Sequence, residues 1–461
     1  REIAEHDIQW ARREVVRKCI YGVDLNPMAV ELAKLALWLT TAAANKPLSF
    51  LDHHLRCGNS LVGINLDSLV TLPTPRTGQG SLLAFFTDQR KKLIDDLLRK
   101  YGEIDSIPDD SLKAVKDKER QFKALIEDER SQRIREIANV KLSTYFENTV
   151  KDDDYEWMSN GVDPGLAPGW GGVRDLDWFK KAQQIAQELR FFHWELEFPE
   201  VFILGGFDVV VGNPPYVRQE SLGEIKTYLS THYQVYHGTA DLYAYFIEKG
   251  ISLLRDGGFF SYIVANKWMR ANYGTPLRRW LKDQNIERII DFGDLPIFQE
   301  ATTYPCILLI SKKPSELTFN ATQVKTLEFS NLTKYVKENS YVVDQSRLND
   351  DGWSLADKNT QDLLDKLQNL GIPLGEYVSG KIYYGIKTGL TDAFVIDADT
   401  RKKLINEDPK SSEIIKLFLA GRDVKRYHPP EGDKYVITFP KGWTREVSGG
   451  AEDAFGWLKE N

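Results

Sequence analysis

The chain has 461 residues, and at roughly 150 residues per domain this length predicts about three domains. Hydrophobic residues make up 42% of the sequence, which is enough for sizeable cores and excludes a disordered protein. The formal net charge of −7 is a point against DNA binding, because a surface that neutralises phosphates is expected to be basic, although a large acidic protein can keep one basic cleft.

Cysteine usage and hydropathy bear on the cellular compartment. Cys19, Cys57 and Cys306 lie far apart without metal-ligand spacing, which suits a reducing cytoplasm, argues against a metal site, and leads us to expect three small core residues. The sequence opens with no signal-peptide pattern, and no apolar run approaches ~20 residues without charges. We therefore expect a cytoplasmic protein that does not enter a membrane.

The first predicted strand ends on a carboxylate. A resemblance to a known enzyme family implies that it spans residues 19–24, ends at Asp24, and is followed by a helix from Met28 to Ala44. A carboxylate in this position can accept hydrogen bonds from both hydroxyls of a ribose. Asn26 and Pro27 equally fit a capped helix start, so Asp24 also suits a plain helix N-terminus.

The segment from Leu66 to Leu189 differs in character from its flanks. Charged and apolar residues alternate at helical spacing over Ser81–Tyr101 and Ser111–Phe146, which predicts two long helices in an antiparallel hairpin. A loop rich in glycine and proline is predicted over 162–172, and a helix over Trp178–Phe192 returns the chain to the flanking domain. We interpret the segment as a structural insertion; DNA clamping or contact with a partner is the alternative.

The most informative stretch is Asn213-Pro214-Pro215-Tyr216, which follows directly on Phe207–Gly212. The apolar residues before the tetrad predict a buried parallel strand, and ligands of open α/β sheets collect at the carboxyl ends of strands. Consecutive prolines make the loop rigid. The tetrad also occurs by chance or as a peptide signal for adaptor domains, but such a signal belongs in a flexible tail.

The residue types of the tetrad suit methylation of an exocyclic amine on a nucleobase, whose nitrogen lone pair is delocalised into the ring. The Asn213 side-chain oxygen and the Pro214 carbonyl can accept the two amine hydrogens and so direct the lone pair at an electrophilic methyl. Tyr216 offers a flat face for a base pulled out of the duplex, a stacking interaction of about 1–3 kcal/mol.

Three further strands are predicted downstream of the tetrad. A helix from Asp241 to Leu254 ends at Asp256-Gly257-Gly258, before a strand over Phe259–Ala265. Two more strands are predicted over Ile286–Phe292 and Tyr304–Ile310. The alternation of strands and helices predicts an α/β fold.

In order and spacing these segments resemble the gamma-class, TaqI-like DNA adenine-N6 methyltransferases, particularly the larger type IIG restriction-modification and phage-defence proteins. The resemblance implies a doubly wound, mostly parallel, Rossmann-like sheet with a helical insertion. It also implies an enzyme that moves a methyl group from S-adenosylmethionine to N6 of a flipped-out adenine in double-stranded DNA. The catalytic loop of this family corresponds to Asn213, Pro214, Pro215 and Tyr216.

The resemblance also implies roles for three other residues. Asp24 corresponds to the ribose ligand, and Asn59 to the side chain that meets the adenine of the cofactor. Some relatives carry Asp at the position of Asn59, and a Gly-Asn turn with no role in ligand binding explains the same residues equally well. Phe298 lies where relatives place a second aromatic ring against the flipped base, or is a hydrophobic plug beneath the loop.

Two segments near the end, residues 382–397 and 419–427, resemble the opening of the target-recognition domain in these enzymes. Basic side chains in that region and after the Gly-Gly strand can contact DNA phosphates, although such clusters are often a solvated face. The candidates are Lys267, Arg270, Arg278, Arg279, Arg422, Lys425 and Arg426.

One part of the family pattern is absent. Relatives bind the methionine end of the cofactor with a Gly-rich loop after the first strand, whereas the glycines at 161–172 and Gly449-Gly450 lack a preceding strand. We therefore expect these residues to be part of a longer protein. The predicted domains are 1–65 and 191–345 for the methyltransferase, 66–190 for the insertion, and 346–461 for a linker and the start of target recognition.

Other functions stay open at this point. Methylation of N4 of cytosine needs the same chemistry, although Ser commonly replaces Asn in that loop, and RNA or protein-glutamine methylation uses a similar tetrad. A non-catalytic DNA-binding or scaffold subunit is the alternative of another class. A nuclease domain or subunit outside this chain would indicate a restriction enzyme, because the sequence offers no convincing carboxylate site for a cleavage metal.

Overall fold

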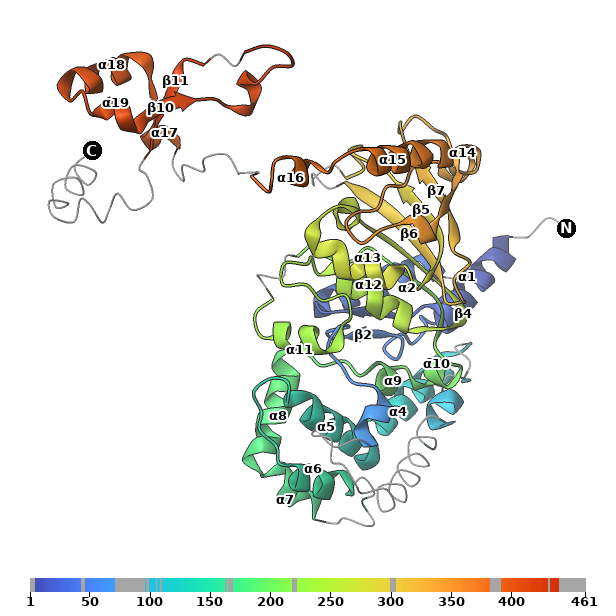
Figure 1. Ribbon diagram of the computed structural model, residues 1–461. Coiled ribbons are helices and arrows are strands. Elements are labelled where there is room, and N and C mark those ends of the chain that lie inside the picture. Colours follow the sequence, from blue (N-terminus) through green and yellow to red (C-terminus); the bar gives the residue numbers. More distant parts are fainter. Residues whose placement is uncertain are drawn as a thin grey trace. The chain divides into compact units, whose positions relative to one another are not determined.

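The computed structural model describes residues 5–42, 46–70, 96, 99–104, 106–107, 110–161, 164, 169–217, 222–298, 304–381, 391–429 and 432–438. Contacts divide the chain into two units, Arg1–Lys366 and Leu367–Asn461 (Figure 1). Several predicted segments lie outside the described residues, namely the end of the first helix at Ala44, most of the helix over 81–101, residues 382–389, and Gly449-Gly450. The predicted domain boundaries stay predictions.

The first unit opens with a small parallel sheet. Its elements are α1 (Glu5–Cys19), β1 (Gly22–Asp24), α2 (Pro27–Thr41) and β2 (Leu55–Cys57). The side chain of Asn26 caps α2 by accepting a hydrogen bond from Met28 N at 2.9 Å, and Pro27 occupies the first turn. The predicted capped helix start is confirmed, and β1 pairs with β2 in parallel.

A helical region follows, and it carries its own core of buried residues, among them Ile137, Trp170 and Phe179. Its helices are α4 (Leu112–Glu127), α5 (Glu129–Ser143), α6 (Asp152–Ser159), α7 (Trp170–Arg174) and α8 (Asp177–Glu188). The prediction of one long helix over Ser111–Phe146 is wrong. Asp128 accepts hydrogen bonds from Arg130 N and Ser131 N as the N-cap of α5, so the chain breaks between two shorter helices.

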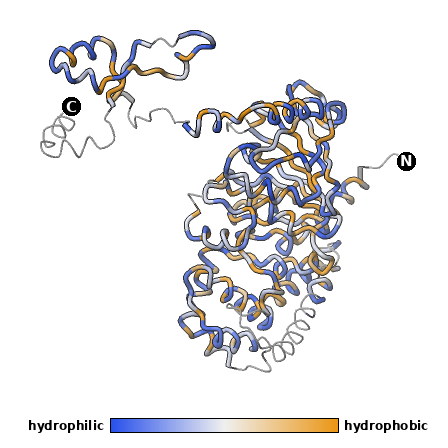
Figure 2. Tube along the Cα trace, in the orientation of Figure 1, coloured by the Kyte–Doolittle hydropathy of each residue, from blue (hydrophilic) through white to orange (hydrophobic). Residues whose placement is uncertain are grey.

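The main sheet has six strands in the order β3-β4-β6-β5-β7-β8. Its strands and the helices around them are α9 (Trp194–Glu197), α10 (Pro199–Ile203), β3 (Phe207–Gly212), α11 (Ile225–His232), α12 (Tyr243–Ser252), β4 (Leu254–Ala265), α13 (Thr275–Leu281), β5 (Asn285–Asp291), β6 (Pro305–Ser311), β7 (Thr318–Gln323), α14 (Leu332–Asn339) and β8 (Tyr341–Asp344). Figure 2 shows hydrophobic stretches crossing the middle of this unit, where the sheet lies.

The predicted α/β class is confirmed, with mixed strand directions. Parallel pairing joins β3 to β4 and β5 to β7, whereas β6 runs antiparallel to both β4 and β5. Because β4 and β5 are each antiparallel to β6, strands β3, β4 and β5 all point the same way. Their carboxyl ends therefore lie at one edge of the sheet.

The junction between α12 and β4 differs from its prediction. The helix ends at Ser252, and β4 already begins at Leu254, which pairs with Phe207. The register then shifts, so that the next pair is Val209 with Phe259, and Gly257 lies in the irregular stretch with φ +75°. The glycines thus permit a bulge inside the strand rather than end the helix.

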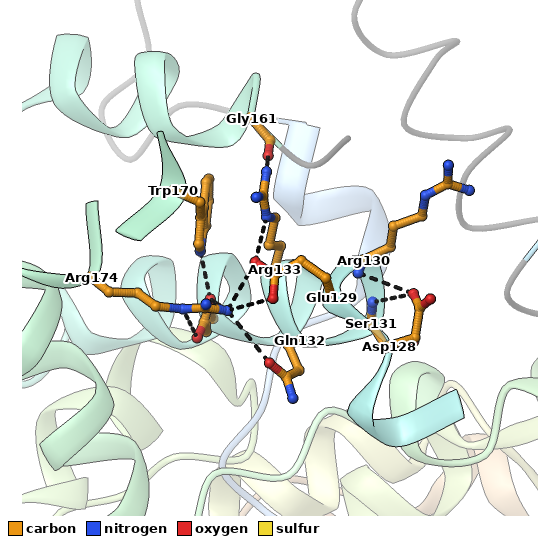
Figure 3. Close-up of polar contacts among 10 residues, drawn as sticks. Asp128, Glu129, Arg130, Ser131, Gln132, Arg133, Gly161, Trp170 and Arg174 are labelled. Carbon is orange, nitrogen blue, oxygen red and sulfur yellow. Dashed lines mark hydrogen bonds and ion pairs between the residues drawn. The ribbon is translucent and has the colours of Figure 1, made fainter. Parts of the chain in front are cut away.

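Polar contacts hold the helical region together around Arg133 (Figure 3). The guanidinium of Arg133 donates to Glu129 Oε1 at 2.9 Å and to the Gly161 carbonyl at 2.7 Å, and it lies 4.7 Å from the Trp170 ring centroid. Arg174 of α7 donates to Glu136 of α5 at 2.9 Å. These contacts fix α7 against α5.

The second unit contains a three-stranded antiparallel sheet in the order β10-β11-β9. The helix α15 (Lys358–Leu370) crosses the division between the units, and the remaining elements are α16 (Leu374–Tyr377), α17 (Thr391–Phe394), β9 (Val395–Asp397), α18 (Ala398–Glu407), α19 (Ser411–Ile414), β10 (Ile415–Phe418) and β11 (Lys434–Ile437). Across the described ranges, no helix is both long and apolar enough to cross a bilayer.

The cysteines do not share one environment. Cys306 in β6 is buried, as expected, whereas Cys19 and Cys57 are exposed. The expectation of three core residues is therefore wrong for two of them, because Cys19 is the last residue of α1 and Cys57 the last residue of β2, and both element ends are exposed.

Candidate active site

A cavity of about 1050 Å³ lies at the carboxyl ends of β1, β2 and β3. It brings together segments that are far apart in the sequence, since Asp24, Asn59 and Asn213 all line it. Pro214 and Pro215 line it as well. The structure thus places five of the predicted site residues around one space.

The loop after β3 is tightly held. Pro214 is buried, and the far end of the loop is tied to the start of α12 by a hydrogen bond of 2.8 Å from Leu242 N to the Val217 carbonyl. Gly212 lies so close to β4 that a Cβ atom there would be 2.8 Å from the Tyr262 ring. The Asn213 side chain, by contrast, is exposed toward the cavity. Its amide is therefore presented on a rigid support.

Tyr216 contacts the sheet and is not among the described residues that line the cavity. Its hydroxyl donates to the Ile263 carbonyl at 3.4 Å, and its ring centroid lies 6.1 Å from that of the buried Tyr243. Burial raises the pKa of the Tyr216 hydroxyl. The residue as a whole is 36% exposed, so part of Tyr216 is accessible beside the loop.

The two predicted cofactor residues are positioned by neighbouring strand ends. One oxygen of Asp24, Oδ1, accepts a hydrogen bond from Asn26 N at 2.7 Å, and the side chain is exposed at the cavity. Asn59 Oδ1 accepts from Leu61 N at 3.2 Å, which leaves the amide NH₂ of Asn59 as the donor group of this side chain. Each of these hydrogen bonds closes a local turn, so each residue has a structural role besides any contact with a ligand.

An apolar wall completes the cavity. It consists of side chains from α11, α12, β4 and the loop before α11, namely Leu222, Ile225, Leu242, Phe246 and Tyr262. Sequence reasoning assigned the apolar positions of α12 to the core and singled out none of them. Phe246 is only partly buried because it packs against the core and faces the cavity at once.

The helical insertion also reaches the cavity, which the sequence did not indicate. Glu188, the last residue of α8, and Arg190 both line it. Arg190 has φ +51°, a conformation that non-glycine residues rarely adopt, so the predicted helix over Trp178–Phe192 ends early. No sequence pattern forecasts this turn.

A second cavity, of about 470 Å³, lies between β1 and β3. Val209 and Val211 of β3 are 56% and 71% exposed, although valines in a strand are normally covered. Among the described residues, β3 pairs with a strand on one side alone. Lys249 lines this space, and burial lowers the pKa of its ammonium group to about 8.

A third cavity, of about 600 Å³, lies at the carboxyl ends of β4 and β5 and includes Lys267 and Arg270. Both side chains are exposed, as a contact with phosphate requires. Arg278 is instead fully buried, where it donates to the Asp350 carbonyl at 2.7 Å, so its prediction as a cleft residue is wrong. Arg279 forms an ion pair with Asp350 at 3.1 Å.

The remaining candidates lie elsewhere. Phe298 is partly buried and is not among the described residues that line the first cavity. Lys425 and Arg426 are exposed in the second unit, where the guanidinium of Arg426 lies 5.0 Å from the Tyr427 ring centroid. The side chain of Arg422 lies outside the described part of the chain.

Comparison with known proteins adds evidence of relationship. The family model described as Eco57I restriction-modification methylase matches residues 18–298. The type II methyltransferase M.PaeR7I of Pseudomonas aeruginosa is 30% identical over 210 residues, which are 42% of this chain and 36% of that protein. The type II restriction enzyme and methyltransferase RM.Eco57I of Escherichia coli is 28% identical over 197 residues, covering 41% and 19%.

The chain therefore spans well under half the length of these curated relatives. Among solved structures, the type IIL restriction-modification enzyme MmeI in complex with DNA is similar, with a TM-score of 0.37 and 13% identity over 79% of this chain and 51% of that one. The type IIG restriction endonuclease BpuSI has a TM-score of 0.31 and 13% identity, covering 86% and 55%.

Proposed function

The chain belongs to the Eco57I restriction-modification methylase family, and from that premise we propose that it methylates N6 of adenine in double-stranded DNA with S-adenosylmethionine as the methyl donor. The observation that carries this proposal is that a single cavity is lined by Asp24, Asn59 and Asn213. These residues come from three strand ends, and they offer the contacts that a nucleoside and an exocyclic amine require.

The size of the cavity fits two ligands at once. Small-molecule sites in proteins have volumes of about 300–1,000 Å³, and this cavity of about 1050 Å³ lies slightly above that range. It leaves room for a nucleoside-containing cofactor and one nucleobase. When bound, S-adenosylmethionine supplies an electrophilic methyl carbon attached to a sulfonium.

The cofactor half of the cavity is formed by β1 and β2. Asp24 keeps Oδ2 for the ribose hydroxyls, because its Oδ1 is engaged by Asn26 N. The Asn59 amide can donate to a ring nitrogen of the cofactor adenine, while Phe246 and Ile225 offer apolar surface on which the purine packs.

The target half is formed by the loop after β3. Asn213 Oδ1 and the Pro214 carbonyl accept the two hydrogens of the adenine amine, so that the nitrogen lone pair points at the methyl carbon. Pro215 keeps the loop rigid. No strong base is needed, since the proton is lost after the nitrogen has become positively charged.

The target adenine leaves the duplex to reach this loop. Tyr216 offers its exposed face for stacking, and Phe298 is proposed as the second aromatic ring. Lys267 and Arg270 lie at the same sheet edge and contact DNA phosphates, and Arg422, Lys425 and Arg426 of the second unit do so during target recognition.

The biological setting that we propose is restriction-modification or phage defence, with a nuclease domain or subunit outside this chain as partner. One curated relative is named a type II methyltransferase, and another is named a type II restriction enzyme and methyltransferase. N4-cytosine methylation is the second candidate, since its chemistry also needs an exocyclic amine. Asn rather than Ser at position 213 favours adenine.

The test is to identify the methylated nucleoside. The full-length protein is incubated with S-adenosylmethionine carrying an isotopically labelled methyl group and with plasmid DNA, and the digested nucleosides are separated by mass spectrometry. We expect label on N6-methyldeoxyadenosine. Label on N4-methyldeoxycytidine would establish the second candidate, and absence of label together with DNA binding would indicate a non-catalytic subunit.

A further inference from the structure

We propose that residues 188–192, the return segment of the helical insertion, form one wall of the cofactor site, and that Arg190 is a positioning residue for the loops that carry Asp24 and Asn59. The assignment rests on the proposed function, because it takes this end of the cavity to hold the cofactor. It gives the insertion a part in cofactor binding beyond that of a structural addition.

The main chain of the return segment lies beside the loop after β2. Asn59 N donates to the Arg190 carbonyl at 2.7 Å, and Phe192 N donates to the Val62 carbonyl at 2.8 Å. Asn59 and Phe191 also form a parallel bridge. The return segment therefore pairs with the loop after β2 through two main-chain hydrogen bonds and one bridge, and Asn59 takes its position from it.

Two glycines permit this close approach. A Cβ atom on Gly58 would lie 2.4 Å from the Phe192 ring, and one on Gly63 would lie 2.0 Å from the Phe192 carbonyl oxygen. Real Cβ atoms do not come so close to a ring or a backbone oxygen, so any side chain here would push the segments apart. The fit is specific to this pair of segments.

The side chain of Arg190 joins the ends of β1 and β2. Its guanidinium donates to the carbonyl of Leu25, which follows Asp24, and it lies 3.4 Å from Cys57 Sγ. Both contacts come from one guanidinium nitrogen, Nη1, whose positive charge strengthens hydrogen bonds to its acceptors. One side chain thus fixes the spacing between the Asp24 turn and the Asn59 turn.

The backbone of Arg190 is strained, and its neighbours hold it in place. A residue with φ +51° persists where the surroundings determine its conformation, and such residues concentrate at functional sites. His193 provides the anchor. Its Nδ1 accepts from Ile64 N at 3.3 Å, and its Nε2 lies 3.0 Å from Asn139 Oδ1 in α5, so the return segment is fixed to the insertion.

The experiment compares Arg190→Ala, Arg190→Gly and Arg190→Lys with the wild type in the full-length protein. Arg120→Ala is the matched control, because Arg120 is an exposed arginine of the same insertion that pairs with Asp117 in its own helix. The measurements are the Kd for S-adenosylmethionine by calorimetry, its KM, kcat at saturating cofactor, and the melting temperature without cofactor.

We expect Arg190→Ala to raise the Kd and KM for the cofactor about tenfold, the effect of losing one charge-assisted hydrogen bond, with kcat within about twofold of wild type. Arg190→Lys should recover part of the affinity. Arg190→Gly relieves the backbone strain, so it should lose the same affinity without loss of melting temperature, and it keeps the test usable if the alanine variant folds poorly.

Unchanged cofactor affinity in both Arg190→Ala and Arg190→Gly would overturn the assignment. It would also be overturned if affinity, kcat and melting temperature all fell together in Arg190→Gly, because that pattern indicates general damage. A wild-type protein that binds no S-adenosylmethionine would instead refute the proposed function, so the two failures are distinguishable.

Discussion

The catalytic sheet and the helical insertion are stabilised in different ways. The sheet packs around a large cluster of buried apolar side chains that includes Phe260, Leu308 and Tyr243, and the charged Arg278 of α13 is buried as well. The insertion buries charged side chains as well, among them Arg133 and Lys118, and uses polar contacts between its helices. Buried polar contacts are directional, so they set the orientation of helices more than they add stability.

The two regions also differ in their expected roles in methyl transfer. The apolar sheet supports rigid loops at its carboxyl edge, and the predicted chemistry lies in those loops. Of the described residues of the insertion, Glu188 and Arg190 line the cavity, and both lie at its end. We therefore expect changes at the sheet edge to reduce methyl transfer without loss of stability, and changes inside the insertion to do the reverse.

The largest effect is expected for Asn213→Ala. Loss of one hydrogen-bonding partner that stabilises developing charge lowers kcat by about 10²–10³-fold, and the cofactor Kd should stay within about twofold because Asp24 and Asn59 are unchanged. Methyl incorporation into DNA and calorimetric binding of S-adenosylmethionine measure the two quantities. Asn339→Ala, a change of an exposed residue in α14, is the control. Wild-type turnover in the Asn213 variant would contradict the assignment of the chemistry to the sheet-edge loops.

Among changes at the sheet edge, Tyr216→Ala should have the next largest effect on methyl transfer. Loss of base stacking weakens capture of the flipped adenine by about 1–3 kcal/mol, so KM for DNA rises while the melting temperature changes little. Fluorescence of 2-aminopurine at the target position reports the flipped state. Tyr216→Phe keeps the ring and loses the hydrogen bond to Ile263, so it should flip the base normally. Equal flipping in the alanine variant would exclude the stacking role.

At the junction of the two regions, His193 should make stability depend on pH. Burial, together with the nearby cations Arg135 and Lys249, lowers its pKa to about 3. The unfolded state therefore takes up a proton below pH ~6.5 while the folded state does not, so the free energy of unfolding falls as pH falls from ~6.5 toward 3, by up to about 1.4 kcal/mol per pH unit. Denaturant unfolding at pH 7.5 and 5.5 measures the difference.

His193→Gln is the matched variant for the pH series, because it removes the titrating group and keeps polar atoms in its place. The drop in stability between pH 7.5 and 5.5 should be smaller in this variant than in the wild type. An identical drop in both proteins would mean that His193 does not titrate as described, and that the junction is not sensitive to pH.

The smallest effect is expected inside the insertion. Arg174→Ala removes the contacts with Glu136 and Glu129, which are partly exposed, and should lower the free energy of unfolding by about 1 kcal/mol. The kcat for methyl transfer should stay at the wild-type value. Thermal melting and a methyl-transfer assay on one preparation test both parts, and reduced kcat would show that the insertion affects the chemistry through more than its return segment.

Much of the sheet could be predicted from the sequence because its signals are local. The valine run predicted β3 with the observed bounds, although its predicted burial is wrong because Val209 and Val211 are exposed. The capped helix start at Asn26 and Pro27 was recognised correctly. The joint position of Asp24, Asn59 and Asn213 came from the rule that parallel strands end at one edge, together with the family resemblance. Their roles toward ligands stay predictions.

One of the missed features has a local cause, and the others depend on contacts distant in sequence. Asp128 caps a helix in the middle of an apparently continuous helical pattern, and Gly257 permits a bulge rather than a helix end. The burial of Arg278 depends on the Asp350 carbonyl, 72 residues away. Arg190 adopts its left-handed turn because the return segment docks against the loop after β2, which no local pattern reveals.

The most direct measurement is a structure of the full-length protein with DNA and an inert analogue of S-adenosylmethionine. We predict a flipped adenine whose amine nitrogen lies within ~3.2 Å of both Asn213 Oδ1 and the Pro214 carbonyl, with the analogue against Asp24 and Asn59. An analogue bound away from the cavity at the ends of β1, β2 and β3, or an adenine held elsewhere, would contradict this prediction.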